Sequence, residues 1–214
     1  MTTATTHTYK TIDPSKLEKR DAYFLSVSLL VPRPIAWVST LSKDGVRNLA
    51  PFSWFNAISA NPPLVYFAPG RSPDGSKKDT LCNVEETGEF VVNIVTEELA
   101  EAMNETAIDF PRDVDEFDAA GLSAAPCEVV SPPRVAESPV SFECKRYDVV
   151  HIGPDGAGGA MVIGEIVRFH IDERVLNDGR VDVDLLRPIG RMGGMDYTRT
   201  RDHFEILRKK FRPE

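Results

Sequence analysis

The most informative segment of the chain reads Arg33-Pro34-Ile35-Ala36-Trp37-Val38-Ser39-Thr40-Leu41. Its apolar and β-branched residues predict a β-strand over 35–41. Lys43-Asp44-Gly45 then predicts a hairpin turn, and residues 46–59 are expected to return as one long, irregular strand. Pro51 lies inside that strand and cannot donate a backbone hydrogen bond, so we expect a bulge or an edge position there.

The other segments predict a fold in which strands dominate. Apolar and β-branched runs predict further strands over 64–68, 89–95, 140–150 and 161–171. Capping residues and helical spacing predict helices over 14–29, 77–86, 97–104, 114–120 and 198–211. Strands and helices do not alternate regularly, which disfavours a doubly wound sheet. The pattern favours a mainly β protein, an antiparallel barrel with peripheral helices.

Composition places the chain among ordinary globular proteins. It has 214 residues, 42% hydrophobic and 27% charged, with a formal net charge of −8. This length suits one sizeable core, so we expect a loose tail over 1–12 and one domain over 13–214. No apolar run approaches the ~20 residues of a membrane helix, and residues 1–9 lack signal-peptide order. The acidic charge argues against nucleic acid, and we expect a cytoplasmic protein that binds neither nucleic acid nor membrane.

The cysteines, histidines and glycines form no recognisable site motif. Cys82, Cys127 and Cys144 include no CxxC pair, and their odd number fits no disulfide framework, so plain thiols are expected. The four histidines show no HxxxH or HExxH spacing, and the sequence predicts no metal site. The glycine-rich stretch over 153–159 lacks GxGxxG and joins two expected strands, which predicts a hairpin loop.

Small polar and aromatic side chains are mixed along the expected strand pair at 33–40 and 50–59. A flat heteroaromatic ligand needs apolar walls for its faces and hydrogen-bond partners at its edge. This strand pair is therefore a candidate ligand site, and a pair with one solvated face is the alternative. The residues concerned are Ser39, Thr40, Ser53, Asn56 and Ser59, beside Trp37, Trp54 and Phe55.

A second candidate site lies where a loop enters the helix expected over 77–86. Cations, a hydroxyl and free backbone amides at a helix N-terminus suit a phosphate group. A solvated helix start with Asp79 as a first-turn acid is the alternative. The residues are Lys77, Lys78, Asp79, Thr80 and Asn83.

Several motifs, in order and spacing, resemble the flavin reductase-like family. They are Arg33 to Thr40, Asn48-Leu49-Ala50-Pro51-Phe52-Ser53-Trp54-Phe55-Asn56-Ala57-Ile58-Ser59, Asn61-Pro62-Pro63, Lys78-Asp79-Thr80 with Asn83, Phe90-Val91-Val92-Asn93, Val162-Ile163-Gly164-Glu165, and Gly190-Arg191-Met192-Gly193-Gly194 with Tyr197. The resemblance covers residues 20 to 200. It implies an FMN-binding split β-barrel, a Greek-key antiparallel barrel with peripheral helices, usually a homodimer with flavin near the subunit interface.

The resemblance also implies which residues bind the cofactor. Residues 37–40 and 53–56 would line the flavin and its ribityl chain, and residues 78–80 would serve the phosphate. Residues 191–194 would border the open face of the ring, where a substrate enters. No catalytic residue is assigned, because hydride transfer to flavin requires no acid or base. The cofactor-binding residues are Trp37, Val38, Ser39, Thr40, Ala50, Pro51, Ser53, Trp54, Phe55, Asn56, Lys78, Asp79 and Thr80.

One departure from the family pattern concerns the electron donor. Many relatives carry a histidine a few residues before Ile163-Gly164, near the nicotinamide, where this chain has Gly159-Ala160-Met161. His151 on the preceding strand could substitute through space, although a partly exposed strand histidine is the preferred interpretation. The resemblance implies an NAD(P)H-dependent flavin reductase that passes hydride to flavin N5. The alternatives are a tightly bound FMN electron-transfer protein, resembling a flavoredoxin, with a protein or other donor, and a relative that has lost flavin.

Overall fold

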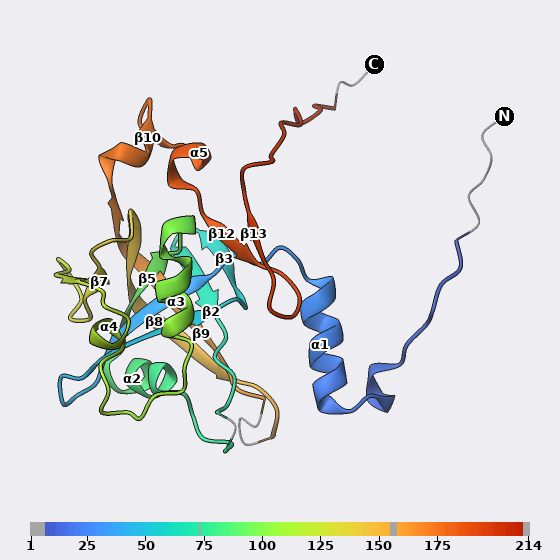
Figure 1. Cartoon of the computed structure of the whole chain (residues 1–214), viewed down its shortest axis with the longest axis horizontal. Coiled ribbons are helices and arrows are strands. Elements are labelled where there is room, and N and C mark those ends of the chain that lie inside the picture. Colours follow the sequence, from blue (N-terminus) through green and yellow to red (C-terminus); the bar gives the residue numbers. More distant parts are fainter. Residues whose placement is uncertain (1–6, 73, 155–157, 212–214) are drawn as a thin grey trace.

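Seven antiparallel strands form one sheet in the computed structural model, which describes residues 7–72, 74–154 and 158–211. The strand order is β2-β1-β5-β8-β9-β4-β3. The expected mainly β, antiparallel architecture is thereby confirmed (Figure 1). The strands are β1 (Ala36–Leu41), β2 (Arg47–Phe52), β3 (Phe55–Ala60), β4 (Pro63–Phe67), β5 (Glu89–Ile94), β8 (Val140–His151) and β9 (Ala160–Ile171).

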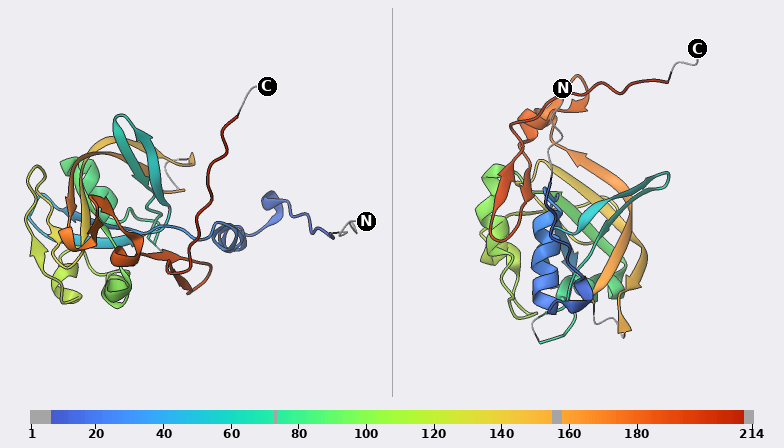
Figure 2. Two further views of the ribbon diagram at one scale, coloured as in Figure 1. Left: turned by 90° about the horizontal axis from the view of Figure 1, so that it is seen from above. Right: turned by 90° about the vertical axis from the view of Figure 1, so that its right-hand side faces the viewer.

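The two edge strands of this sheet are consecutive in the chain. β2 ends at Phe52 and β3 begins at Phe55, so only Ser53 and Trp54 separate the two edges. The sheet therefore has to curl until its edges approach each other (Figure 2). Ala68 N donates to Trp54 O at 2.9 Å and fastens this crossing. The result is a barrel that stays split between β2 and β3.

The crossing also corrects one expectation. Residues 46–59 do not form one strand, because the chain leaves one edge of the sheet at Phe52 and enters the opposite edge at Phe55. The edge position expected for Pro51 is confirmed. Pro51 lies on β2, opposite Trp37, and β2 has a neighbouring strand on one side only, where a residue without an N–H is tolerated.

Alternate residues of the strands point into the barrel and form its core. α2 (Asp79–Thr87) packs against this core with Leu81 and Val84. A Cβ on Gly164 of β9 would lie 2.2 Å from Phe90 Cζ, so only glycine allows this close packing. The core residues are Ala36, Val38, Phe55, Val65, Phe67, Leu81, Val84, Phe90, Val92, Cys144, Ala160 and Val162.

The intervening residues of β1 and β2 face outward into a second core. Trp37 is fully buried there, beneath α3 (Ala100–Glu105) and α4 (Glu116–Ala119), and its Nε1 donates to Thr106 Oγ1 at 2.9 Å. The two cores lie on opposite sides of β1 because successive strand residues point to opposite faces. The second core comprises Ile35, Trp37, Leu49, Val95, Leu99, Met103, Phe117, Val135 and Ile189.

Short elements complete the described chain. The expected helices over 14–29, 97–104 and 114–120 are each shorter or divided. No helix among the described residues is long and apolar enough to cross a membrane. The short elements are η1 (Pro14–Lys16), η2 (Glu97–Leu99), η4 (Glu173–Val175), α5 (Val183–Leu186), and the strand pairs β6 (Ala124–Ala125) with β7 (Arg134–Val135), β10 (Leu176–Asn177) with β11 (Arg180–Val181), and β12 (Ile189–Arg191) with β13 (Tyr197–Arg199).

Two segments stand away from the barrel. α1 (Lys19–Leu29) lies to one side, and the chain after β13 extends outward (Figures 1 and 2). The prediction of a helix over 198–211 is wrong, because residues 197–199 form β13 and residues 200–211 have no regular secondary structure. Phe204, Leu207 and Phe211 are exposed. A helix this short gains little without a surface to pack against.

The glycine-rich stretch over 153–159 joins β8 and β9, which pair as consecutive antiparallel strands. This agrees with the expected hairpin connection and excludes a strand-to-helix phosphate turn at this place. Residues 155–157 lie outside the described part of the chain.

Candidate functional site

A buried hydrogen-bonded cluster fixes the N-terminus of α2 against β1 and β2. Thr80 Oγ1 donates to Asn48 Oδ1 at 2.7 Å, and Asn83 Nδ2 donates to Thr40 Oγ1 at 3.0 Å. Thr40 Oγ1 in turn donates to Asn48 Oδ1 at 3.1 Å. Fully paired polar groups of this kind rigidify their surroundings. The start of α2 is thereby held beside the edge strand β2.

Glu116, the first residue of α4, closes this cluster from the other side. Its carboxylate accepts hydrogen bonds from Asn48 Nδ2 at 2.7 Å and from Leu49 N at 3.1 Å. Burial raises the pKa of Glu116 to about 7, because desolvation of the charged form outweighs these hydrogen bonds. The cluster therefore contains a carboxyl group that titrates near neutral pH.

A cavity of about 150 Å³ lies between β2, the start of α2 and residues 106–110. Lys78, Asp79 and Thr80 line one side of it, and Ala50 and Pro51 line another. Lys78 Nζ forms an ion pair with Asp109. The first N–H groups of a helix have no intrahelical partner and carry partial positive charge. These N–H groups and Lys78 are the donors of this cavity that suit a phosphate group, and the carboxyl groups of Asp79, Asp109 and Glu116 line it as well.

Two further cavities continue along the edge of the barrel. A cavity of about 330 Å³ shares Pro51 and Ala107 with the first and is also lined by Arg33 and Ser53. A third, of about 360 Å³, shares Arg33 and Ser53 with the second. We refer to the three cavities together as the β2 groove. Its far end is lined by Trp54, Phe55, Asn56 and Tyr66.

Arg33 organises the middle of the β2 groove. Its side chain is buried, and Nε donates to Ser53 Oγ at 3.2 Å. Nη1 donates to the carbonyls of Val27 at 2.6 Å and Leu30 at 2.7 Å, and Nη2 donates to Met192 O at 3.0 Å. The guanidinium therefore joins the end of α1, the split of the barrel and the loop after β12.

The sequence-predicted cofactor residues fall into two groups. Successive side chains of β1 point alternately to the two cores. Trp37 is fully buried in the second core and Val38 is fully buried in the barrel core. Ser39 Oγ donates to Pro133 O, and Thr40 belongs to the polar cluster. These four side chains do not line the β2 groove. The residues that do are Ala50, Pro51, Ser53, Trp54, Phe55, Asn56, Lys78, Asp79 and Thr80.

Sequence reasoning missed several residues of the groove. Asn104 and Ala107 come from α3 and the segment after it, and Tyr23 comes from α1. None of these lies in a segment with a recognisable ligand pattern. Arg33 carried a usable signal, because an arginine directly before the proline of a buried apolar strand needs a specific set of partners.

The position of His151 agrees with the preferred interpretation, because it is a partly exposed histidine at the end of β8. Its Nε2 lies 3.2 Å from Glu85 Oε1 on α2, and it pairs in register with Ala160. Ala160 itself is buried in the barrel core. None of the described residues that line the β2 groove is a histidine.

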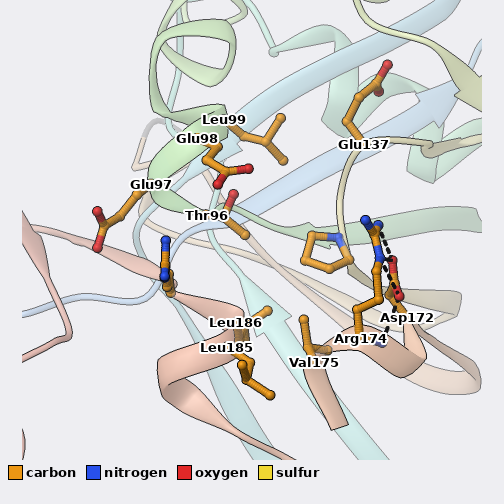
Figure 3. A pocket seen from close by; sticks show the side chains of 12 residues that line it. Thr96, Glu97, Glu98, Leu99, Glu137, Asp172, Arg174, Val175, Leu185 and Leu186 are labelled. Atoms are coloured by element: carbon orange, nitrogen blue, oxygen red, sulfur yellow. Dashed lines mark hydrogen bonds and ion pairs between the residues drawn. The ribbon is translucent and has the colours of Figure 1, made fainter.

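A separate pocket of about 440 Å³ lies between η2, η4 and α5 (Figure 3). Glu97, Glu98, Glu137 and Asp172 all line it, and the Asp172 carboxylate is paired with Arg174. None of the predicted cofactor residues lies there. The β2 groove is therefore the better candidate for an anionic cofactor.

The fold is a split barrel with a groove along its open edge. Residues 28–186 match the family described as flavin reductase like domain. The chain belongs to the flavin reductase-like family, as its sequence motifs predict.

Relatives in sequence and solved structures are similar to this chain over almost its whole length. The uncharacterized protein BH2278 of Halalkalibacterium halodurans is 41% identical over 199 residues, which cover 92% of this chain and 95% of the relative. The nitrilotriacetate monooxygenase component B structure from Bacillus cereus is 36% identical with a TM-score of 0.90, covering 94% of this chain and 100% of that one. The 2-nitrobenzoate 2-nitroreductase NbaA of Pseudomonas fluorescens is also 36% identical, with a TM-score of 0.84, covering 96% and 99%.

Proposed function

We propose that the β2 groove binds FMN and that the protein is an NAD(P)H-dependent flavin reductase. The order of sites along the groove supports this proposal. A phosphate-type site at Lys78 is followed by a passage along Ala50 and Pro51, and then by a wider region beside Trp54 and Phe55. This order matches the phosphate, the ribityl chain and the flat ring of FMN.

The residues present fit the cofactor chemically. Lys78 and the first amides of α2 would hold the phosphate, and Ser53 offers a hydroxyl toward the edge of the ring. Arg33 and Arg191 place two guanidinium groups in the same cavity, where positive charge favours the added electron density of a reduced ring. When bound, FMN supplies hydride and electron transfer at N5, and the protein contributes position and electrostatics.

A neighbouring cavity is the candidate binding site for the nucleotide of an electron donor. A cavity of about 540 Å³ shares Asn104, Arg191 and Tyr197 with the middle of the β2 groove. The Arg191 guanidinium lies 4.4 Å from the centre of the Tyr197 ring. Arg199 also lines this cavity. Glu97 and Glu101 line the same cavity, and Glu97 pairs with Arg199 at 3.2 Å. Support for docking of a nicotinamide dinucleotide there therefore comes from Arg191 and the Tyr197 ring.

Anaerobic stopped-flow absorption tests the reductase proposal. The protein loaded with FMN is mixed with NADH or NADPH, and bleaching of oxidised flavin is expected to exceed that of free FMN. Flavin fluorescence quenching reports FMN binding separately. Quenching without bleaching would contradict the nicotinamide donor but retain the cofactor, and no quenching would contradict both.

A tightly bound FMN electron-transfer protein is the second candidate. The observation that favours it is the lack of an imidazole among the described groove residues, with Ala160 buried in the barrel core. This candidate predicts FMN that survives dialysis and turns over slowly with NADH. The two structures that are 36% identical carry different names, so the similarity supports the reductase class and no single acceptor.

We also propose that the protein works as a homodimer. Tyr23 and Phe24 of α1 line the β2 groove and are exposed in the single chain, as are Leu29 and Leu30. A second copy that covers α1 would bury these side chains and shield the groove from solvent. Light scattering coupled to size-exclusion chromatography is expected to give twice the mass of one chain. The mass of a single chain at micromolar concentration would contradict the dimer.

A further inference from the structure

Three side chains that are far apart in the sequence meet on the outer wall of the barrel. Cys127 comes from the segment between β6 and β7, Glu143 from β8 and His170 from β9. The Cys127 sulfur, a Glu143 oxygen and a His170 ring nitrogen all lie within 4.8 Å of one another. Glu143 and His170 are diagonal neighbours on one face, since Ser141 pairs with His170 in the β8–β9 register.

Glu143 is held rigidly at the centre of this cluster. It is fully buried, and its Oε1 accepts from Glu128 N at 2.8 Å while Oε2 accepts from Val129 N at 2.7 Å and Val130 N at 3.0 Å. Burial opposes ionisation, but these bonds and the hydrogen bond with His170 lower the pKa of Glu143 to about 2. The carboxylate is therefore ionised, and His170 Nε2–H donates to Oε1 at 2.6 Å.

We propose that Cys127, Glu143 and His170 bind a zinc ion, with water as the fourth ligand. One thiolate, one imidazole and one carboxylate form a donor set that zinc accepts in tetrahedral geometry. Zinc–ligand distances of about 2.0–2.3 Å place tetrahedral ligands roughly 3.3–3.7 Å apart. The 4.8 Å limit of the cluster exceeds this spacing by about an ångström, which the half-buried Cys127 and His170 side chains have to close by moving toward Glu143.

The three ligands balance the charge of the ion. Zinc takes the place of the hydrogen between His170 Nε2 and Glu143 Oε1, the imidazole then carries its hydrogen on Nδ1, and the Cys127 thiol proton is released to solvent. The thiol proton leaves as the cation binds the sulfur. A thiolate, a carboxylate and a neutral imidazole then neutralise the two charges of the ion. The half-buried Cys127 and His170 leave a route from solvent.

The backbone already provides the outer contacts that such a site needs. The N–H groups of Glu128, Val129 and Val130 orient the ligating carboxylate and leave one position on Oε1 for the ion. Bound zinc would fasten residues 127–130 to β8 and β9. None of the three ligands lines the β2 groove, so this site is independent of the proposed flavin chemistry.

Cobalt substitution tests this site in the full-length, FMN-loaded protein. After chelator treatment, Co²⁺ is titrated and the spectrum is recorded against the same protein without cobalt, which cancels the flavin absorption. We expect visible bands of a tetrahedral ion and a thiolate-to-cobalt charge-transfer band, at one equivalent per chain, both abolished by added Zn²⁺. Absence of the charge-transfer band would overturn the proposal.

Matched variants assign the ligands. Cys127→Ser is expected to lose the charge-transfer band, and Cys127→Ser and His170→Gln are each expected to weaken zinc binding by at least about tenfold. Cys82→Ser, a half-buried thiol on α2, is expected to behave as the parent. A charge-transfer band that survives Cys127→Ser would refute the assignment.

Two further readouts do not depend on how the variants fold. Zinc is expected to raise the melting temperature of the parent protein, because it binds the folded state. It is also expected to protect Cys127 from alkylation, as followed by mass spectrometry under mildly denaturing conditions. Equal alkylation with and without zinc would contradict the site.

Discussion

Arg33 Nε donates a hydrogen bond to Ser53 Oγ at 3.2 Å, which ties the entrance of β1 to the crossing between the two edges of the barrel. The remaining donors of the same guanidinium reach carbonyls at the end of α1 and at Met192. One buried side chain therefore sets the relative positions of three segments that border the β2 groove.

Arg33→Lys is expected to loosen all three segments. A lysine keeps the charge but loses the planar fork of donors, so hydrogen bonds to Ser53 and Met192 cannot both survive. We expect the free energy of unfolding to fall by about 2–3 kcal/mol, and the dissociation constant for FMN to rise about tenfold or more. Urea unfolding and flavin fluorescence measure the two effects.

Arg146→Lys is the control for that variant. Arg146 is exposed on β8 and donates from Nη1 to Glu85 O at 2.8 Å, away from the groove. Its substitution is expected to change unfolding by less than about 0.5 kcal/mol and to leave FMN binding unchanged. Equal losses of FMN affinity in the two variants would argue against the role of Arg33.

Lys78→Ala is expected to weaken FMN binding by about tenfold, because it removes a cation from the proposed phosphate end of the groove. The neighbouring Lys77 pairs with Glu85 at 2.5 Å and does not line the groove, so Lys77→Ala is the matched control. Riboflavin lacks the phosphate and should bind the Lys78 variant and the parent equally well. A riboflavin affinity that falls as much as the FMN affinity would place the phosphate elsewhere.

Glu116 is expected to make stability depend on pH between about 4.5 and 7. The pKa of Glu116 rises from 4.5 to about 7 on folding, so in this window the folded state holds a proton that the unfolded state has lost. Stability from this group is fully present below 4.5 and is lost as pH rises through 7, by about 3 kcal/mol.

Urea unfolding at a series of pH values measures this loss. Glu116→Gln cannot titrate, so the unfolding free energy of the parent minus that of the variant should fall as the pH rises from 5 to 8. A difference that stays constant with pH would mean that Glu116 ionises normally in the folded protein.

Gly164→Ala is expected to destabilise the barrel by about 1–3 kcal/mol, because the new methyl group would collide with the buried Phe90 ring. Gly70→Ala is the control, since a Cβ there meets nothing within 4 Å. Thermal unfolding should separate the two variants by several degrees. Equal melting temperatures would show that the Phe90 ring can move aside at little cost.

Local patterns in the sequence predict most of the strands and two parts of the site. The run from Ile35 to Leu41 is a strand, and Pro51 occupies an edge, because β propensity and the missing proline N–H act over a few residues. The sequence also places Lys78 beside the start of a helix, because the residues that mark a helix start lie close together in the chain. These features do not depend on distant partners.

Other features required the tertiary structure. The sequence marks Trp37 as a flavin contact, yet its side chain lies under α3 and α4, because the two faces of β1 can be told apart only when the covering elements are in place. The helix expected over 198–211 does not form, since amphipathic spacing has no effect where the chain meets no packing surface.

Local sequence patterns predict most of the strand segments and the edge proline, and the motifs together indicate the family to which the chain belongs. The folded chain is needed to bring Arg33, Ser53 and Met192 together beside one groove, and Cys127, Glu143 and His170 together on another wall of the barrel. The physical reason is that propensities and turns act between near neighbours. The approach of distant residues is set by how the sheet curls and how its strands pair in register.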